Sequence, residues 1–163
     1  MSWEKAGFGG GCHWCTEAYF TNLLGVKKVE QGWISAAAPN DGPSEAVIVH
    51  YDALRIPLSV LIAIHLHSHS STSRHKLREK YRSAVYVFDA GLIGPVQKMI
   101  AACASDFDEP IVTEVLEFRS FESNTERYQD YYRKNKGSAF CERYIQPKLL
   151  SLQSQYAAYF NAT

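Results

Sequence analysis

The stretch Gly9-Gly10-Gly11-Cys12-His13-Trp14-Cys15-Thr16-Glu17 sets the first change of structure along the chain. Its three glycines end an apolar run, and a helical pattern begins directly after them at Cys12. The free backbone N–H groups and partial positive charge of a helix N-terminus favour a thiolate over a thiol. Cysteines placed in this way have lowered pKa values and are nucleophilic near neutral pH. We therefore interpret Cys12 as a catalytic thiol, against the alternative of a buried structural cysteine in a glycine-rich turn.

The composition is that of a folded, charge-balanced chain. It has 163 residues, 46% of them hydrophobic, which is enough for one domain over residues 1–163 with its own core. The 17 basic and 17 acidic residues cancel, which argues against nucleic acid or an anionic membrane as the main partner. No apolar run reaches the length of a membrane span, and no signal-peptide pattern opens the chain, so we expect a cytoplasmic protein. Four cysteines in a reducing compartment indicate catalysis or metal binding rather than a disulfide scaffold.

Hydrophobic periodicity predicts strands and helices that alternate along the chain. The expected strands are 2–8, 26–35, 45–51, 81–88 and 111–118, and the expected helices are 12–24, 57–67 and 92–103. A capping-box pair, Ser123 and Glu126, predicts a further helix through Lys134, and Pro147 begins a last one. Because many connections are short, an α+β sandwich is favoured over a doubly wound parallel sheet.

Several motifs, in this order along the chain, together resemble the A type of peptide methionine sulfoxide reductase. The family opens with Gly-Cys-Phe-Trp at its first strand-to-helix junction, where this chain has Gly11-Cys12-His13-Trp14. The other matching segments are Glu45-Ala46-Val47, Tyr81-Arg82-Ser83-Ala84, Gln129-Asp130-Tyr131-Tyr132 and Pro147-Lys148-Leu149. The resemblance implies an α+β fold, a two-layer sandwich around a mainly antiparallel sheet with a ferredoxin-like core. It also implies reduction of methionine-S-sulfoxide, free or in proteins, with electrons from a thioredoxin-type partner or dithiothreitol and with no metal or other cofactor.

The chain also departs from the family pattern. His13 replaces the Phe of the opening motif, and Lys76 stands where the family has an aspartate. Tyr128 replaces a histidine, and the loop after Trp33 is short and lacks the segment that supplies an active-site tyrosine. The substrate pocket of the family therefore cannot be carried over whole.

The resemblance assigns roles to three residues that should converge at the end of the first strand. Cys12 attacks the sulfoxide sulfur and becomes a sulfenic acid as methionine leaves. Glu45 is the candidate general acid, because apolar neighbours on its strand should raise the pKa of its carboxyl; the alternative is an exposed strand-end glutamate. Tyr81 is the candidate hydroxyl donor to the sulfoxide oxygen, and the alternative is a core aromatic on a strand.

Two neighbours of Cys12 are candidate substrate-binding residues. Trp14 would form the wall for the substrate methyl group, or pack helix against sheet, or do both. His13 has three open interpretations: it lines the pocket, it lowers the pKa of Cys12 when protonated, or it faces solvent.

Two cysteines compete for the resolving role, in which a thiol condenses with the sulfenic acid. Cys15 has the redox spacing of Cys-x-x-Cys enzymes, whereas Cys141 matches a position where the family often has a recycling cysteine, and we favour Cys141. The apolar face that carries Cys15 also allows simple core packing, which is what we expect for Cys103.

Two alternative functions remain open from the residues alone. One is a general thiol–disulfide oxidoreductase that uses Cys12 and Cys15. The other is a metal-binding or sensor domain that uses these cysteines with His65, His67, His69 and His75. Histidines near a helix C-terminus more often bind its free carbonyls, so we expect no metal site.

Overall fold

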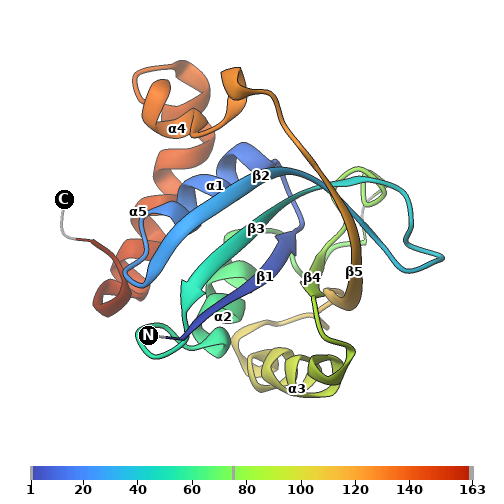
Figure 1. The fold of residues 1–163 in the computed structure, drawn as a ribbon. Coiled ribbons are helices and arrows are strands. Elements are labelled where there is room, and N and C mark those ends of the chain that lie inside the picture. Colours follow the sequence, from blue (N-terminus) through green and yellow to red (C-terminus); the bar gives the residue numbers. More distant parts are fainter. Residues whose placement is uncertain (1, 75, 162–163) are drawn as a thin grey trace.

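Five strands form one sheet that closes on itself. The computed structural model describes residues 2–74 and 76–161. The strands are β1 (Trp3–Gly9), β2 (Val26–Ala36), β3 (Ser44–Asp52), β4 (Ala84–Val87) and β5 (Glu114–Ser123). Their spatial order is β1-β3-β2-β5-β4, and the end of β1 also pairs with β4, which completes a small barrel (Figure 1). Every pairing is antiparallel except that of β4 with β5, so the expected mainly antiparallel sheet is confirmed.

The closure of the sheet corrects the expected architecture. A mixed α and β structure is confirmed, but the two-layer sandwich with a ferredoxin-like core is not, because the sheet has the topology of a closed barrel. Gly7 on β1 shows why the strands can curl so tightly. A Cβ at this position would come within 2.9 Å of both Ile34 and Tyr86, so the close approach of these strands depends on the missing side chain.

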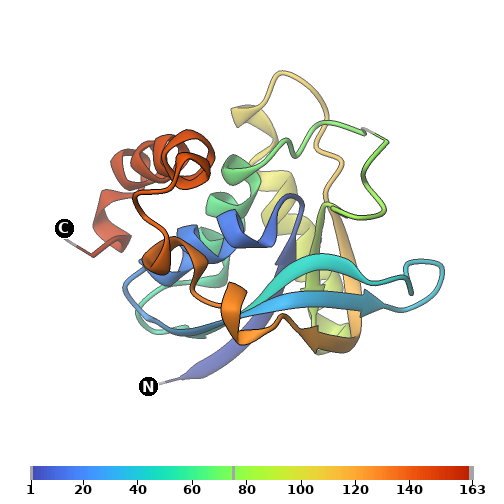
Figure 2. The ribbon, with the colours of Figure 1, turned by 90° about the horizontal axis from the view of Figure 1, so that it is seen from above.

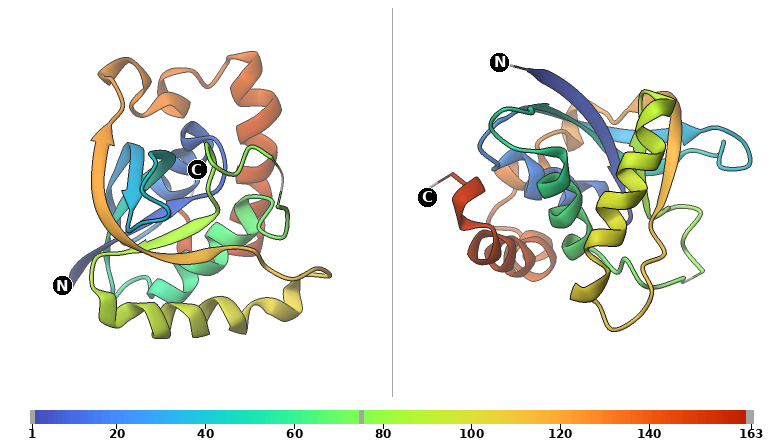
Figure 3. Two further views of the ribbon diagram at one scale, coloured as in Figure 1. Left: turned by 90° about the vertical axis from the view of Figure 1, so that its right-hand side faces the viewer. Right: turned by 90° about the horizontal axis from the view of Figure 1, so that it is seen from below.

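Helices cover the outside of the barrel unevenly (Figure 2). The helices of the described residues are α1 (His13–Thr21), α2 (Leu58–Ser68), α3 (Ile93–Ala102), α4 (Tyr131–Lys134) and α5 (Gln146–Gln155). Helix α1 packs on β2 and β3, α2 packs on α3 and α5, and α3 packs on β5 (Figure 3). A π-helical turn, Cys141–Ile145, leads directly into α5, and Pro147 lies in the first turn of that helix as expected. None of the helices described is long and apolar enough to cross a membrane.

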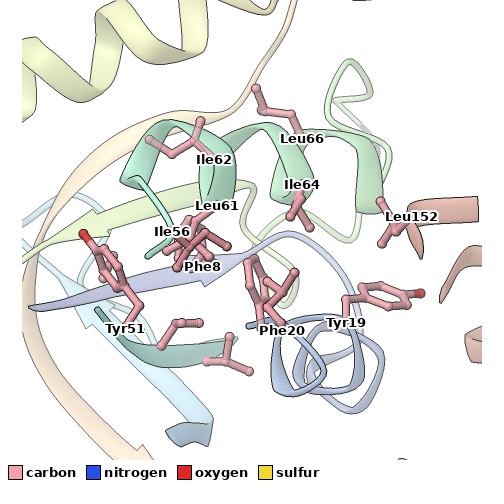
Figure 4. Close-up of a cluster of buried hydrophobic side chains, with 14 of the residues drawn as sticks. Phe8, Tyr19, Phe20, Tyr51, Ile56, Leu61, Ile62, Ile64, Leu66 and Leu152 are labelled. Atoms are coloured by element: carbon pink, nitrogen blue, oxygen red, sulfur yellow. The ribbon is translucent and has the colours of Figure 1, made fainter. Parts of the chain in front are cut away.

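The main core lies between the sheet and the helices. Helix α2 is buried as expected, with Leu61, Ile62 and Ile64 fully inaccessible to solvent. These side chains meet Phe8 from β1 and Phe20 from α1, whose rings stack with centroids 4.8 Å apart (Figure 4). A second, smaller cluster of buried side chains is formed by Ile34, Ala36, Ala46, Ile48, Ala84 and Tyr86. Its alanines leave little volume to fill, which suits a tightly closed sheet.

Several element boundaries differ from the expected ones. The strand expected at 81–88 begins only at Ala84, and the helix expected at 12–24 ends at Thr21. The expected strand 111–118 lies later, at Glu114–Ser123. The capping-box helix is wrong, because Ser123 ends β5 and its hydroxyl donates to the Asn124 carbonyl. A short 3₁₀ turn and the four-residue α4 follow instead.

Candidate active site

The turn that connects β1 to α1 places Cys12 at the start of the helix. Cys12 is the N-cap residue of α1, and its carbonyl accepts the first helical hydrogen bonds, from the N–H groups of Cys15 and Thr16. Gly10 makes this turn possible. Its φ of +155° is a conformation that side chains disfavour, and a Cβ there would lie 2.4 Å from the His69 ring. The glycine run is therefore required by both the backbone and the packing around it.

The surroundings of Cys12 favour its thiolate. The thiol of Cys15 donates a hydrogen bond to Cys12, and this contact is the largest cause that lowers the pKa of Cys12 below 9.0. The backbone N–H groups of Trp14 and Cys15 act in the same direction, whereas burial and the charge of Glu45 oppose them. The depressed pKa expected for a cysteine at a helix N-terminus is thus present, and its main cause is a neighbouring thiol.

Three of the four cysteines gather at this point, and all four are free. The pKa of Cys15 is raised above 9.0, first by its hydrogen bond to Cys12 and then by burial, so Cys15 stays protonated as the donor. The hydroxyl of Tyr19 donates to Cys15, and the charge of Cys141 also acts on Cys15. Cys141 is fully buried. Cys103 packs against the core from the end of α3, as expected, and takes no part in this cluster.

Glu45 lies beside the N-terminus of α1, on strand β3. Its side chain is nearly buried, so the alternative of an exposed strand-end glutamate is wrong. One carboxylate oxygen accepts the backbone N–H of His13 at 3.2 Å, and the other lies 3.7 Å from the Lys80 ammonium. Because the charge of Glu45 acts on Cys12, the two groups expected to converge here are within electrostatic reach of each other.

Tyr81 joins this group through Lys80 and is not on a strand. It lies in the turn before β4, and the core-strand alternative for it is therefore wrong. A hydrogen bond with Tyr81 is the largest cause that raises the pKa of Lys80, with the charges of Tyr81 and Glu45 next. The ammonium of Lys80 therefore connects Tyr81 with Glu45. The sequence reasoning did not select Lys80, although its place directly before Tyr81 was a usable signal.

Aromatic rings cover Trp14. Its ring is parallel to those of Tyr131, at 4.2 Å between centroids, and Tyr128, at 5.3 Å, and Phe140 packs edge-on. The Trp14 Nε1 atom is buried and has no hydrogen-bond partner among the residues that the structure describes. Burial raises the pKa of Tyr131, and the charges of Cys141 and Cys12 raise it further, so Tyr131 belongs to the site as well. Sequence reasoning matched the Tyr131 motif without giving this residue a role.

Glu17 anchors the segment that carries these rings. Its carboxylate accepts the N–H groups of Asp130 at 3.0 Å and Tyr131 at 3.2 Å, and the Gln31 amide at 2.8 Å. Gln31 also donates to the Tyr128 carbonyl. Burial raises the pKa of Glu17, while the three donors lower it. One buried carboxylate on α1 thus fixes the position of α4 over Trp14.

His13 is buried next to Glu45, so the solvent-facing interpretation is wrong. Its Nδ1 atom lies 2.7 Å from the Gly32 carbonyl, and its Nε2 atom lies 3.5 Å from the Glu45 carboxylate. The ring packs edge-on against Trp33. Burial lowers the pKa of His13, and the charge of Lys80 also lowers it, so a protonated His13 is not the cause of the low Cys12 pKa.

His65 and His69 contact backbone carbonyls, and His69 also contacts the Ser83 hydroxyl. His65 lies 2.7 Å from the Gly9 carbonyl, and His69 lies 2.6 Å from the carbonyl of His65, as expected near a helix end. Burial lowers the pKa of His65 to about 4. His67 pairs with Asp106, and His75 lies outside the described residues. Within 2–74 and 76–161 no group of three or more metal-binding side chains is found.

A cavity of about 780 Å³ opens beside Lys80 but does not reach Cys12. It lies between the loop after β2 and the segment before β4, with Pro39, Arg74, Arg78, Glu79 and Arg82 in its walls. Arg78 and Arg82 are committed to backbone carbonyls, so they serve as supports for these loops.

The comparisons with known proteins decide the family. The family model for peptide methionine sulfoxide reductase matches residues 4–159. The chain belongs to this family. It is 32% identical to a Deinococcus radiodurans peptide methionine sulfoxide reductase MsrA, over 94% of this chain and 82% of that protein. Among solved structures it is similar in fold to methionine sulfoxide reductase A of Corynebacterium diphtheriae, with a TM-score of 0.71 and 20% identity over 83% of this chain and 76% of that one. Mxr1 of Saccharomyces cerevisiae in complex with Trx2 is also similar, with a TM-score of 0.62 and 17% identity over 80% of this chain and 85% of that one.

Proposed function

We propose that this peptide methionine sulfoxide reductase family member reduces methionine-S-sulfoxide, free or in proteins, with Cys12 as the nucleophile. The single observation that carries the proposal is the thiolate-favouring site of Cys12 beside the Glu45 carboxyl. The Cys12 thiolate attacks the sulfoxide sulfur, and the sulfoxide oxygen takes a proton. The products are methionine and a Cys12 sulfenic acid, so one thiolate, one sulfoxide and one proton are consumed.

Glu45 supplies the proton in this proposal. Its carboxyl is nearly buried and lies within electrostatic reach of Cys12, and this position supports the role of proton donor to the sulfoxide oxygen. Tyr81 donates a hydrogen bond to the sulfoxide oxygen, and its contact with Lys80 supports a position close to Glu45. Trp14 and its covering rings form the wall for the substrate methyl group.

The sulfenic acid is resolved in two thiol steps. Cys15 reacts first, because its thiol already touches Cys12, and this step forms the Cys12–Cys15 disulfide and one water. Cys141, which acts electrostatically on Cys15, then attacks the Cys15 sulfur and releases the Cys12 thiolate. Cys141 thus keeps the recycling role favoured from the sequence, with Cys15 as the intermediate carrier.

Trapping the protein after one turnover tests the order of the two steps. The Cys141→Ser variant should accumulate the Cys12–Cys15 disulfide. Formation of a Cys12–Cys141 disulfide in the Cys15→Ser variant at the wild-type rate would contradict the proposed order.

A thioredoxin-type dithiol protein closes the cycle. The complex of the related Mxr1 with Trx2 supports a partner of this kind, and the proposed chemistry itself takes its electrons from thiols alone. A reducing compartment such as the cytoplasm suits four free cysteines.

Turnover of a methionine-S-sulfoxide peptide with dithiothreitol tests the proposed reaction. We expect methionine from the S epimer and none from the R epimer. The Cys12–Cys15 contact also suits a general thiol–disulfide oxidoreductase. A protein with that function would reduce a disulfide peptide and form no methionine. This result would favour the thiol–disulfide function over sulfoxide reduction.

A further inference from the structure

The backbone of Lys80 is fixed beside the candidate general acid. Its carbonyl accepts the backbone N–H of Glu45 at 2.9 Å and the hydroxyl of Ser44 at 3.0 Å. The N–H of Lys80 donates to the Leu77 carbonyl at 3.1 Å, within the segment before β4. Lys80 is therefore held against the start of β3, and its side chain extends from a defined point next to Glu45.

The Lys80 ammonium contacts two groups that the proposed reaction uses. Its Nζ atom lies 3.7 Å from a Glu45 carboxylate oxygen and 5.0 Å from the centre of the Tyr81 ring. A hydrogen bond with Tyr81 and the charges of Tyr81 and Glu45 raise the pKa of Lys80, so it stays positively charged near neutral pH. An ammonium has three N–H donors, and these two neighbours occupy two of them at most. Because the side chain is 61% exposed and lines the cavity of about 780 Å³, the third donor is open to a ligand.

We propose that Lys80 is a catalytic residue whose ammonium donates a hydrogen bond to the sulfoxide oxygen. This inference rests on the proposed function, in which the oxygen contacts both Glu45 and Tyr81. A ligand atom that contacts both side chains comes within reach of the ammonium that lies against both. The sulfoxide oxygen carries partial negative charge and can only accept hydrogen bonds, so a charged N–H donor suits it.

The positive charge of Lys80 has its effect during the attack by Cys12. Negative charge grows on the oxygen as the thiolate approaches the sulfoxide sulfur, and a cationic donor in place beforehand lowers the barrier to this step. Lys80 keeps its three protons throughout. The balance of the step is therefore unchanged: one thiolate, one sulfoxide and one proton are consumed. This role is the same for either protonation state of Glu45.

Lys80 also acts on Glu45, and this second effect has the opposite sign. A positive charge 3.7 Å away favours the Glu45 carboxylate over the protonated acid. If this were the only effect of Lys80, loss of its charge would favour the acid and speed up methionine formation. A contact with the oxygen predicts a slower reaction, so the sign of the change distinguishes the two effects.

Methionine formed in one turnover from a methionine-S-sulfoxide peptide by the reduced Lys80→Met protein tests the contact. The new side chain has neither the charge nor the N–H donors, and we expect a rate loss of about 10- to 100-fold, less than for a fully buried donor. Lys80→Arg keeps both properties and should recover most of the rate. Lys28→Met is the matched control without an expected effect, because Lys28 is 62% exposed and lies 3.7 Å from a glutamate, Glu30. A Lys80→Met rate that equals or exceeds the wild-type rate would overturn the inference.

The Glu45→Gln background shows whether Lys80 acts only by holding Glu45 in place. On this background Lys80→Met should still lower the single-turnover rate, because the contact with the oxygen is lost independently of the carboxyl. An absence of any further loss would mean that Lys80 acts through Glu45, and would overturn the inference.

Binding to the Cys12→Ser protein provides a readout without turnover. Calorimetry compares the Kd of a methionine-S-sulfoxide peptide with that of the same peptide carrying methionine, since the two differ only in the oxygen. We expect the sulfoxide to bind more tightly, and Lys80→Met to weaken its binding about tenfold without changing that of the methionine peptide. Sulfoxide binding that does not respond to Lys80→Met would overturn the inference. A wild type that forms no methionine, together with sulfoxide binding that needs Lys80, would reject the proposed function and leave the Lys80 contact in place.

Discussion

Cys12 lies at the N-terminus of one helix and Cys103 at the C-terminus of another, and the pKa values of their thiols differ accordingly. Cys12 is the N-cap of α1, and Cys103 is the C-cap of α3. Burial acts on both thiols and raises the pKa of each. Only Cys12 ends with a lowered pKa, because only Cys12 receives hydrogen bonds from a thiol and two backbone N–H groups. Cys103 instead meets the charge of Asp106, which raises its pKa further.

This difference shows that hydrogen-bond donors, and not exposure, separate the two cysteines. Both are half-buried. A helix N-terminus presents free N–H groups to a thiolate, whereas a helix C-terminus presents carbonyls, which cannot stabilise negative charge. The Cys-x-x-Cys spacing then adds the Cys15 thiol as the strongest donor.

The largest expected difference is in the rate of methionine formation when Cys12 or Cys103 is replaced by serine. Cys12→Ser should lower methionine formation by at least about 10⁴-fold, because a serine hydroxyl is neither soft nor ionised near neutral pH. Cys103→Ser should keep the wild-type rate, because Cys103 lies outside the thiol cluster. The measurement is steady-state turnover of a methionine-S-sulfoxide peptide with dithiothreitol. An active Cys12→Ser protein would show that the reaction needs Cys12 no more than it needs Cys103.

The Glu45→Gln variant tests whether the Cys12 site also needs Glu45 as a general acid that protonates the sulfoxide oxygen. We expect methionine formation in one turnover to fall by about 10²- to 10⁴-fold, the usual contribution of a general acid. Glu117 on β5 pairs with Arg119 at the surface, so Glu117→Gln is a matched control with no expected effect. Equal rates for the two variants would mean that Glu45 serves only to bind the N-terminus of α1.

The Cys15 thiol can be tested apart from catalysis by alkylation of Cys12. Because the pKa of Cys12 lies below 9.0 and that of Cys103 above it, Cys12 should keep reacting as the pH falls to values at which Cys103 no longer does. Cys15→Ala removes the main donor, and alkylation of Cys12 near pH 7 should slow roughly tenfold, as expected for one hydrogen bond to a charged group. The rate constants follow from mass spectrometry of timed samples. No change in Cys15→Ala would assign the low pKa to the backbone N–H groups instead.

The sequence predicted those parts of the site that depend on neighbours along the chain. The glycine run, the helix start and the Cys-x-x-Cys pair are local, and Cys12 stands at a helix N-terminus as expected. Periodicity also gave the buried helix α2 and the apolar face of α3, since packing of regular elements follows their repeat. The family resemblance, based on several separate motifs, is confirmed by the match over residues 4–159.

The parts that the sequence could not predict depend on contacts between distant segments. Closure of the sheet follows from pairing of β1 with both β3 and β4, which no local pattern encodes. The helix expected after Ser123 was wrong because Gln129 and Gln31 hold this segment by side-chain hydrogen bonds in place of helical ones. The place of Lys80 in the site depends on a side chain far away in the sequence, Glu45.

The smallest expected effect concerns Cys103, the second cysteine of the comparison. Asp106 raises the pKa of Cys103 by its charge alone, and its side chain is about half exposed. Asp106→Asn should therefore speed alkylation of Cys103 by only about twofold at pH 8, because solvent and salt screen exposed charges. The gain should shrink further in high salt, whereas the Cys12 rate, set by short hydrogen bonds, should not respond to salt. A large gain at Cys103 would show that charge alone can make a thiol at a helix C-terminus reactive, and the distinction drawn from the hydrogen-bond donors of Cys12 would then fail.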